Sequence, residues 1–497
     1  MKTARSLVLL AVGVCLSVSA AARQDRFAGL DAYAAKSAKD WKVPGLAVAV
    51  LHDGKVVLSK GYGVRELGRT EAVDEHTLFA VGSTTKAMTA ALVGMLVDET
   101  KLAWDDPVLK HLPSFRLKDP AVTRELTVRD LLTHRGGLGN ADFLWYGQNN
   151  STSQILQRVS LLEPAYSLRS RFIYQNVMYA VAGQVIEAVS GRPWTEMIRT
   201  RIFEPIGMGE SVATLSLVPQ GANVAAPHYE IDGVVKVIEN MAVDSVAPAG
   251  SVWSSVHDMA KWLQFLLDGG VVSGKRLLSE RTAAELFRPQ TVVPDTMYPT
   301  TRLVKPHWMT YALGWFQQDY HGRAVDFHTG SIDGMVAIAG LIRDEKLGVF
   351  VLGNLDHAEV RHALMYSVFD RAAGKPGLDW SAELQKLYGE NQQRNAQGAK
   401  RIESQRVAGT SPSVPLNAFA GTYSDALRGD IEVTADGNTL RIKHGTFAGA
   451  LEHWHYNTFR ARWSATWRGS PLVNFTLGAV GGRPDSLEMS GGRFLRR

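Results

Sequence analysis

The residue pattern changes abruptly near residue 382, and this change constrains the fold more than any other feature of the sequence. Before it, apolar residues recur with both helical and strand spacing. Residues 382–411 are rich in Gln, Asn, Lys, Arg and Ser, and the run Thr410–Pro415 has the composition of a linker. Beyond it the pattern is that of strands alone. We therefore expect a first domain over residues 23–381, a polar helix and linker over 382–411, and a second domain over 412–497.

The first domain has the pattern of an α+β fold. Two runs, Leu46–Leu51 and Lys55–Lys60, flank an Asp-Gly turn and predict a hairpin near its start. Strand-rich ends around a helix-rich middle predict an antiparallel sheet built from both ends of the domain, with helices packed on it. Two further strands are expected at Met335–Ile342 and Leu347–Leu352, and helices at Ser83–Asp98, Leu126–Leu132, 172–190 and Ser255–Leu267.

The second domain contains short strands at regular spacing, separated by glycine-rich turns. This spacing predicts a small all-β barrel or sandwich. The expected strands include Thr422–Tyr423, Ile431–Thr434, Thr439–Lys443, Val473–Leu477 and Ser486–Met489.

The first 22 residues have the features of a secretory signal. Lys2 and Arg5 precede an apolar run over Leu7–Val18, and small residues follow it. The run is shorter than the roughly 20 residues of a membrane-spanning helix, which argues against the alternative of an N-terminal anchor. The single cysteine, Cys15, lies within this segment, so cleavage near Ala22 leaves a chain without disulfides. We expect a periplasmic or secreted protein without stable membrane insertion.

The balance of charges argues against a nucleic-acid partner. The chain carries 54 basic and 49 acidic residues, and they are interspersed along it. Surfaces that bind nucleic acid concentrate their positive charge instead. Hydrophobic residues make up 45% and charged residues 21% of the sequence, which is typical of a globular protein rather than a disordered one.

Ser83 and Lys86 form the first candidate for chemistry. The serine stands where a helix is expected to begin, with the positive end of the helix dipole behind it. A lysine three residues later lies on the same helix face, close enough to touch the hydroxyl. Serine needs an adjacent base to become a nucleophile, and lysine serves as one only when burial or neighbours lower its pKa. The alternative without a catalytic role is that Ser83 caps the helix and Lys86 is a solvated side chain.

Two later segments carry side chains suited to the same reaction. Tyr174 and Asn176 stand two apart in a segment leading into a helix, so a phenol and an amide point the same way. The run His328–Ser331 precedes an apolar strand, and we expect it on an edge strand beside a cleft. Gly330 allows close approach of the backbone, and the N–H of Ser331 can join that of Ser83 as an oxyanion hole. Each segment alone also fits a merely structural role.

Taken together and in this order, the three segments resemble those of the class C β-lactamase-related serine hydrolases. This group includes D-alanyl-D-alanine carboxypeptidases, D-aminopeptidases and esterases. The resemblance covers about residues 27–375. It is carried by Phe79–Lys86, Leu126–Leu138, Phe203–Met208, Pro248–Gly250 and Tyr311–Trp315, and it implies a β-lactamase/transpeptidase-like antiparallel sheet flanked by helices, with an additional helical region.

The resemblance also implies roles for single residues. Ser83 is expected to be the acylated nucleophile, with Lys86 and Tyr174 as its coupled base. Asn176 is expected to position substrate, and Thr329 and Gly330 to line the binding site beside Ser331. His328 departs from the lysine that true β-lactamases usually carry in this third segment. A neutral imidazole holds a carboxylate less strongly than a permanent cation, which favours peptide, amide or ester substrates.

The strand-rich tail is similar to the lipocalin-like C-terminal domain that some members carry. The resemblance rests on Phe419–Tyr423 and Leu451–Phe459. It leaves open whether this barrel covers the active site, stabilises the chain or makes a homo-oligomer.

The sequence therefore predicts an exported serine hydrolase that works through an acyl-enzyme on Ser83, without a metal or other cofactor. Its expected partner is a small-molecule or peptide substrate. A class C-type β-lactamase is the alternative within enzymes, and a catalytically silent peptide-binding or scaffolding protein is the alternative from another class. Phe143, Trp145, Tyr146, Trp253 and Trp315 are candidates to line the cleft, although core packing explains any one of them.

Overall fold

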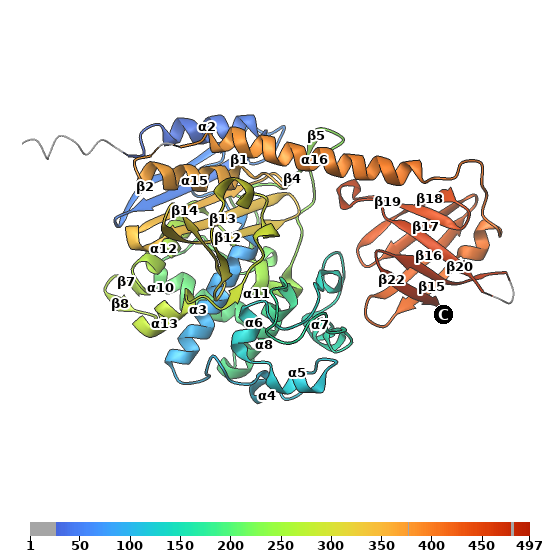
Figure 1. Ribbon diagram of the computed structural model, residues 1–497, viewed down its shortest axis with the longest axis horizontal. Coiled ribbons are helices and arrows are strands. Elements are labelled where there is room, and N and C mark those ends of the chain that lie inside the picture. The colour runs from blue at the N-terminus through green and yellow to red at the C-terminus, as the bar shows by residue number, and fades with distance from the viewer. Residues whose placement is uncertain (1–25, 376, 479–481) are drawn as a thin grey trace, which may run out of the picture.

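The computed structural model describes residues 26–375, 377–478 and 482–497, so the expected signal segment at 1–22 lies outside the described residues. The chain forms a large α+β body and a small all-β body, which are joined by the long helix α16 (Trp380–Ser404) (Figure 1). No helix within the described ranges is long and apolar enough to cross a bilayer.

The large body is built on one antiparallel sheet of eight strands. The order across it is β2-β1-β14-β13-β12-β11-β10-β9, so the first two strands of the chain lie beside the last strand of the domain. This confirms the expectation of a sheet assembled from both ends. The strands are β1 (Gly45–His52), β2 (Lys55–Gly63), β9 (Thr291–Val292), β10 (Met309–Tyr311), β11 (Phe316–Tyr320), β12 (Arg323–Ile332), β13 (Met335–Ile342) and β14 (Leu347–Gly353).

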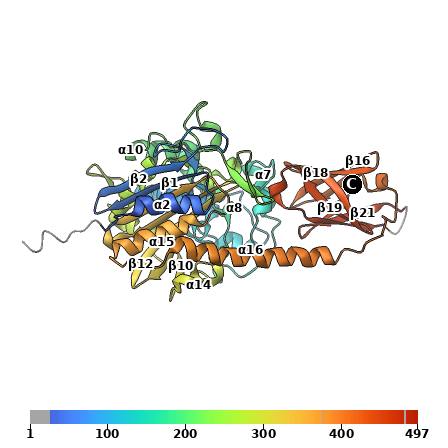
Figure 2. The same cartoon turned by 90° about the horizontal axis from the view of Figure 1, so that it is seen from above.

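Helices cover both faces of this sheet, which is why β1 is apolar at consecutive positions. Leu46, Val48 and Val50 belong to the core under α2 (Leu30–Asp40), α15 (Val360–Ala372) and the start of α16. The alternate side chains, Ala47 and Ala49, belong to the core on the opposite face, with α12 (Val256–Leu267). Seen from above, α2 and α15 lie along one side of the sheet and α16 continues past them toward the barrel (Figure 2). A strand buried on both faces reads as a continuous apolar run.

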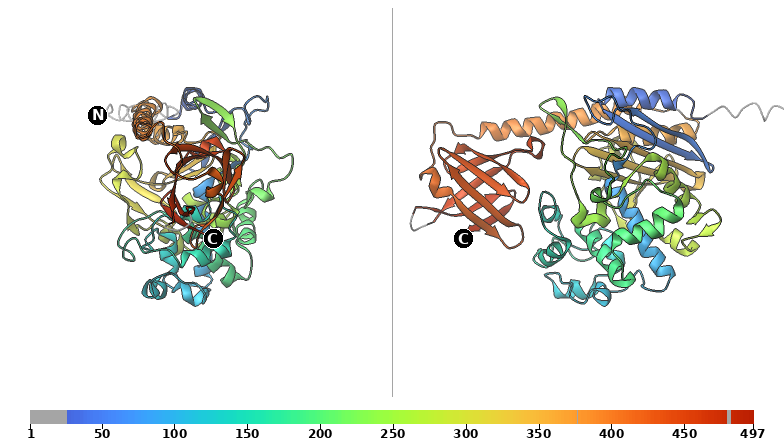
Figure 3. Two further views of the ribbon diagram at one scale, coloured as in Figure 1. Left: turned by 90° about the vertical axis from the view of Figure 1, so that its right-hand side faces the viewer. Right: turned by 180° about the vertical axis from the view of Figure 1, so that it is seen from behind.

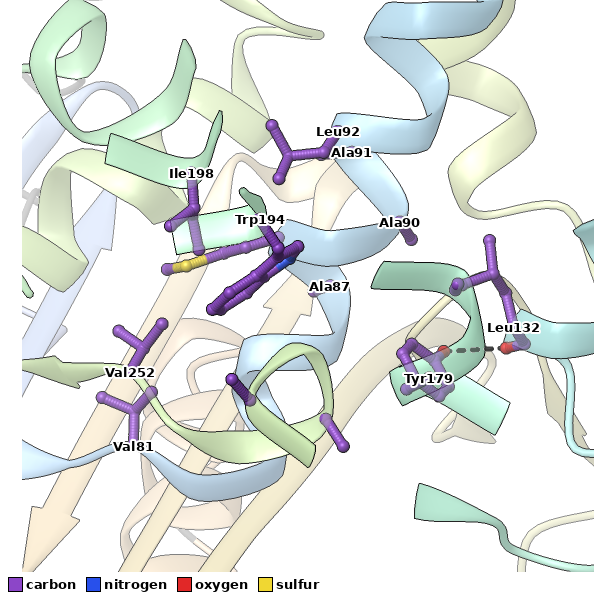
Figure 4. Close-up of a cluster of buried hydrophobic side chains, with 14 of the residues drawn as sticks. Val81, Ala87, Ala90, Ala91, Leu92, Leu132, Tyr179, Trp194, Ile198 and Val252 are labelled. Atoms are coloured by element: carbon purple, nitrogen blue, oxygen red, sulfur yellow. Dashed lines mark hydrogen bonds between the residues drawn. The ribbon is translucent and has the colours of Figure 1, made fainter. Parts of the chain in front are cut away.

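Helix α3 (Thr85–Asp98) runs through the middle of the core that contains Ala47, Ala49 and α12. Every residue from Thr85 to Leu96 is buried, which explains why the helix has no polar face. Trp194 lies beside it and donates its indole N–H to Thr89 Oγ1 at 3.2 Å (Figure 4). The neighbouring helix α8 (Asn176–Ser190) is tied by a 2.8 Å hydrogen bond from the Tyr179 hydroxyl to the Leu132 carbonyl. This packing holds the first turn of α3 in place.

The expected helices form, with differences at their ends. The helix expected over 172–190 begins at Asn176, because the N–H of Gln175 is taken by the ring of His134 and the backbone there is extended. Thr127 caps α6 (Val128–Leu132), as its place before the helix predicts, by accepting a hydrogen bond from the Asp130 N–H. The remaining helices of the large body are α4 (Val108–His111), α5 (Pro120–Glu125), α7 (Thr152–Val159), α9 (Trp194–Ile198), α10 (Glu204–Ile206), α11 (Ala247–Gly250), α13 (Glu280–Leu286) and α14 (Thr301–Val304).

Small two-stranded sheets also form outside the main sheet. They pair β3 (Phe79–Ala80) with β6 (Trp253–Ser254), β4 (His228–Ile231) with β5 (Val234–Val237), and β7 (Val271–Val272) with β8 (Lys275–Arg276).

The expectation of an edge strand for His328–Ser331 is wrong in topology. These residues lie on β12, which has β13 on one side and β11 on the other. Strand β11 is short, however, and its pairing with β12 ends at Phe327. Pairing with β13 continues to Ile332. The far half of β12 therefore presents a local edge inside a continuous sheet.

The small body is a closed antiparallel barrel of eight strands (Figure 3). Closure comes from pairing of the first and last strands, with Tyr423 opposite Arg496. Alternate residues, such as Leu440 and Ile442, fill the interior while their neighbours are exposed. The strands are β15 (Gly421–Asp425), β16 (Gly429–Asp436), β17 (Thr439–His444), β18 (Phe447–His455), β19 (Thr458–Trp463), β20 (Leu472–Leu477), β21 (Pro484–Met489) and β22 (Gly492–Arg496).

Candidate active site

Ser83 lies in a single 3-10 turn, Gly82–Thr84, directly before α3. The turn follows the short strand β3, so the serine stands between a strand end and a helix start. Its side chain is partly exposed, in contrast to its buried neighbours Gly82 and Thr84. The local structure therefore presents one hydroxyl at the N-terminal end of a buried helix, where the helix dipole favours developing negative charge.

Lys86 is fully buried on the first turn of α3, and its amine has three oxygen neighbours. Nζ lies 2.9 Å from Ser83 Oγ, 2.8 Å from Asn176 Oδ1 and 2.7 Å from the Ala249 carbonyl oxygen. Burial lowers the pKa of Lys86 well below its usual 10.5, against a smaller opposing attraction from Asp142. The spacing of Ser83 and Lys86 thus produces the predicted contact, in surroundings that favour the free amine.

Tyr174 lies in the extended segment just before α8 and faces the same amine. The centre of its ring is 4.9 Å from Lys86 Nζ. Burial raises the pKa of Tyr174 well above 10, and a hydrogen bond with Ser83 opposes that rise without reversing it. The ring packs against His134, with centroids 4.3 Å apart. Tyr174 is therefore a neutral phenol in contact with both Ser83 and Lys86.

Asn176, the first residue of α8, connects Lys86 to a carboxylate that sequence reasoning missed. Its Oδ1 accepts from Lys86, and its Nδ2 donates to Asp142 Oδ1 at 2.9 Å. Asp142 also accepts from the Trp145 indole at 2.8 Å and from Asn140 Nδ2 at 3.1 Å. These bonds fix which way the Asn176 amide points. Nothing in the residues around Asp142 marks it as part of the site, because it arrives there through the fold of a loop.

The third segment lies against the turn that carries Ser83, and two glycines make this approach possible. A Cβ at Gly330 would lie 2.0 Å from the Val81 carbonyl oxygen and 3.1 Å from the Ser83 nitrogen. A Cβ at Gly82, whose φ is +53°, would lie 2.6 Å from the Ser331 nitrogen. The backbone N–H groups of Ser83 and Ser331 are thus neighbours, as an oxyanion hole requires.

His328 and Thr329 are held by tyrosines that stand apart from them in the sequence. His328 Nδ1 lies 2.7 Å from the Thr329 carbonyl oxygen, and its Nε2 lies 3.0 Å from the Tyr311 hydroxyl. Burial lowers the pKa of His328 to about 3, and the nearby Lys86 acts in the same direction. The Tyr298 hydroxyl and Thr329 Oγ1 are 2.9 Å apart. His328 is therefore a neutral side chain with both ring nitrogens engaged.

A buried ion pair between Arg361 and Glu359 contacts the segment His328–Ser331. Arg361 on α15 donates to the Gly330 carbonyl at 2.6 Å and to Ser331 Oγ at 2.8 Å. Its guanidinium pairs with Glu359 at 3.0 Å, and Glu359 also lies 2.6 Å from His362 Nδ1. Because Arg361 lies on a helix far along the chain, its link to Ser331 could not be found from the sequence.

The other residues singled out in the sequence divide between core and site. Trp253 and Trp315 are buried core residues and do not line a cleft. The side chain of Gln175, between Tyr174 and Asn176, donates to the Leu138 carbonyl at 3.2 Å and so points away from Ser83. His134 accepts from the Gln175 N–H at 3.0 Å, in agreement with a structural role.

One group of side chains outside this site has metal-binding donors. His76, Glu210 and His257 place one ligand atom each within 4.8 Å of the others. The group is largely exposed and shares no residue with the Ser83 cluster. Two of the side chains, His76 and Glu210, already form a hydrogen bond of 2.6 Å with each other.

Comparison with known proteins places both bodies of the chain. The Beta-lactamase family model matches residues 30–372, and a domain of unknown function, DUF3471, matches residues 405–494. The chain is 29% identical over 429 residues to unguisins hydrolase ungD of Aspergillus violaceofuscus, covering 80% of this chain and 75% of that protein. It is 24% identical over 319 residues to protein flp of Staphylococcus aureus, covering 63% of this chain and 60% of that one.

Solved structures share the fold at lower identity. An octameric penicillin-binding protein homologue from Pyrococcus abyssi aligns with a TM-score of 0.62 and 22% identity, over 95% of this chain and 100% of that one. A D-stereospecific amidohydrolase from a Streptomyces species aligns with a TM-score of 0.56 and 23% identity, over 68% and 98%. With the family model covering most of the large body, the chain belongs to the Beta-lactamase family of serine hydrolases.

Proposed function

We propose that the chain is an exported hydrolase that cleaves an amide, peptide or ester bond through an acyl-enzyme on Ser83. The observation that carries the proposal is the buried amine of Lys86, 2.9 Å from the Ser83 hydroxyl and in contact with two further oxygens. Export rests on the signal pattern at 1–22 alone, as does a periplasmic or secreted location.

The three neighbours of Lys86 suit a neutral amine acting as a base. Asn176 Oδ1 and the Ala249 carbonyl oxygen can only accept hydrogen bonds, so they take the two N–H groups of a free amine. The remaining lone pair then faces Ser83 Oγ, which supplies its own proton. Burial favours this uncharged form of Lys86. Lys86 removes the proton as Ser83 attacks the substrate carbonyl.

Tyr174 then serves as the proton donor rather than as the base. Its phenol stays protonated because burial raises its pKa. The proton on Lys86 can pass to the leaving group through the Tyr174 hydroxyl, because Tyr174 contacts both Lys86 and Ser83. The N–H groups of Ser83 and Ser331 stabilise the negative oxygen that forms on the substrate, and water releases the acyl group in the second half of the reaction.

The surroundings of His328 favour amide, peptide or ester substrates over β-lactams. Its Nδ1 and Nε2 are both engaged, by the Thr329 carbonyl and the Tyr311 hydroxyl. A neutral ring with no free N–H offers a substrate carboxylate neither charge nor a donor at this position. An amide is the first class to test, since the Streptomyces neighbour is a D-stereospecific amidohydrolase. The silent binding protein is the weaker proposal, because the Ser83 and Lys86 side chains are in reactive contact.

Replacing Ser83 by alanine tests the proposal. We expect Ser83→Ala to lower the turnover of p-nitrophenyl acetate and of a D-alanine p-nitroanilide by about 10⁴-fold or more, because no other hydroxyl takes the acyl group. It should also abolish labelling by a fluorophosphonate probe. Ser160→Ala, at the end of α7, is the matched control and should change neither readout. Activity that survives Ser83→Ala would overturn the assignment.

A further inference from the structure

A cavity of about 700 Å³ lies between the loop after residue 141 and one end of the barrel. Both bodies contribute its walls. Phe143 and Tyr146 line it from the large body, and Arg428, Phe447 and Phe494 line it from the barrel. The cavity combines an aromatic lining with a small number of polar groups, which is the usual composition of a ligand site.

The barrel is held to the large body at two points beside this cavity. The Thr446 N–H donates to the Gly147 carbonyl at 2.9 Å, and a Cβ at Gly147 would collide with the Phe447 ring at 2.2 Å. The Trp467 indole donates to Asp333 at 3.1 Å, and Arg468 donates to the same carboxylate at 3.3 Å. Asp333 directly follows the β12 segment that carries the oxyanion N–H. The barrel end is therefore built against the two loops that flank Ser83.

Asp142 connects the cavity to the reactive serine. It lines the cavity, and its Oδ1 accepts from Asn176, which in turn accepts from Lys86. Three consecutive hydrogen bonds thus lead from the cavity wall to Ser83 Oγ. Asp142 therefore belongs both to the cavity wall and to the hydrogen-bonded network around Ser83.

The cavity contains a guanidinium that has no acidic partner. Arg428 is partly buried and lies over the Phe143 ring, 4.4 Å from its centre, and no carboxylate of the described residues pairs with it. Arg158 approaches from α7, within 3.1 Å of where a Cβ on Gly429 would lie, and it too lacks an ion pair among the described residues. Burial lowers the pKa of His444; its hydrogen bond to the Arg428 carbonyl opposes this, and the charges of Arg158 and Arg428 lower the pKa further.

The other charged side chains that line the cavity are Arg468 and Asp142. Arg468 pairs with Asp333. The carboxylate of Asp142 lies at the large-body end of the cavity and accepts hydrogen bonds from Asn176, Trp145 and Asn140, which are neutral donors. At the barrel end, among the described residues, the charge without an ion pair is the positive one of Arg428. A guanidinium that is stacked on an aromatic ring and partly desolvated is well suited to hold a carboxylate by paired hydrogen bonds.

We propose that the cavity between the two bodies is a substrate subsite that takes an apolar or aromatic group ending in a carboxylate, which Arg428 binds. The inference rests on the proposed function, since the group it holds belongs to the substrate of Ser83. It assigns the barrel a part in substrate selection, made by contact within one chain.

Binding of 4-phenylbutyrate to the full-length protein, measured by calorimetry, tests the subsite without any turnover. The matched neutral ligand is 4-phenylbutanamide. We expect the carboxylate to bind about tenfold more tightly than the amide, which is the usual weight of a hydrogen bond to a charged group. Arg428→Gln should remove this preference and leave the affinity for the amide unchanged, while Arg428→Lys should retain part of it. Arg441→Gln, on the outer face of β17, is the control and should retain all of it.

Each other outcome overturns the proposal. Equal affinity for the two ligands, no binding of either at millimolar concentration, or a preference that survives Arg428→Gln would exclude Arg428 as the anchor. A loss of affinity for both ligands in Arg428→Gln would show that Arg428 only holds the barrel in place. Hydrolysis of p-nitrophenyl acetate is followed in the same samples. Binding without any hydrolysis would refute the proposed function, and with it the assignment of the bound group to a substrate of Ser83, whereas hydrolysis without binding would refute the subsite alone.

Discussion

Adding a single methyl group at Gly330 should separate the two halves of the oxyanion hole. The Cβ of an alanine there would lie 2.0 Å from the Val81 carbonyl oxygen. Non-bonded carbon and oxygen atoms keep roughly 3.3 Å apart. Strand β12 and the turn that carries Ser83 would therefore have to move apart by about 1 Å, because both contacting groups are backbone and neither can rotate away.

The cost to catalysis follows from that displacement. The N–H groups of Ser83 and Ser331 lie on opposite sides of the contact, so the separation moves one donor away from the developing oxyanion. A misplacement of about 1 Å costs on the order of 10²-fold in rate, and loss of one oxyanion donor costs about 10²–10³-fold. We expect Gly330→Ala to lower kcat for p-nitrophenyl acetate by about 10²–10³-fold, or about 3–4 kcal/mol, with a small change in KM.

Steady-state kinetics and thermal unfolding of the same samples separate this effect from misfolding. Gly209→Ala is the matched control, because a Cβ at that position meets no atom within 4 Å and φ is not in the left-handed region. Assays are run well below the Tm of each variant. If Gly330→Ala folds and keeps its kcat within threefold of the parent, the contact is not rigid and the Ser331 N–H is not a donor in the reaction.

Two further substitutions test the electrostatics of the site. Arg361→Met should lower the free energy of unfolding by about 3–5 kcal/mol in urea titrations, because it leaves the buried Glu359 carboxylate without its arginine partner and with His362 alone beside it. Arg462→Met, which breaks an exposed pair, should cost less than about 1 kcal/mol, and equal losses would contradict the reasoning. Burial alone would raise the pKa of Glu359, but Arg361 and His362 lower it below 4.5, so this stabilisation is present above that pH and lost as the pH falls further. Asp142→Asn removes the attraction that raises the pKa of Lys86 against the larger effect of burial. Since the free amine is the active form, the acid limb of the kcat/KM profile should move to lower pH, and a move to higher pH would refute Lys86 as the base.

The contacts within the candidate site were predictable where they depend on local spacing. Ser83 and Lys86 are three residues apart on one helix, so helical geometry alone brings them together. Tyr174 and Asn176 share a direction because the segment before α8 is extended, which their spacing already suggested. What joined these pairs into one site was the family resemblance, because no local rule sets the distance between segments 90 residues apart.

The missed residues act through tertiary contacts that leave no local signal. Asp142 reaches Asn176 from a loop, and Arg361 reaches Gly330 from the far side of the sheet. The local edge of β12 depends on where β11 stops, which is a matter of strand length rather than of residue pattern. The joining of both ends of the first domain in one sheet, and the all-β character of the second domain, were predictable because apolar alternation and the position of the strands along the chain indicate them.

The position of the barrel end shows why a prediction of separate domains misses residues that lie close to the site. The change of pattern near residue 382 predicts a separate second body, but it leaves open whether that body contacts the region of Ser83. The contact depends on few atoms, above all on the missing side chain of Gly147, which lets Phe447 close on the loop that carries Asp142. A glycine there is unremarkable in a sequence. Because of this contact, we expect the specificity of the reaction to depend on both bodies. Removing residues 412–497 should therefore alter which substrates are cleaved more than how fast the acyl-enzyme forms from a small ester.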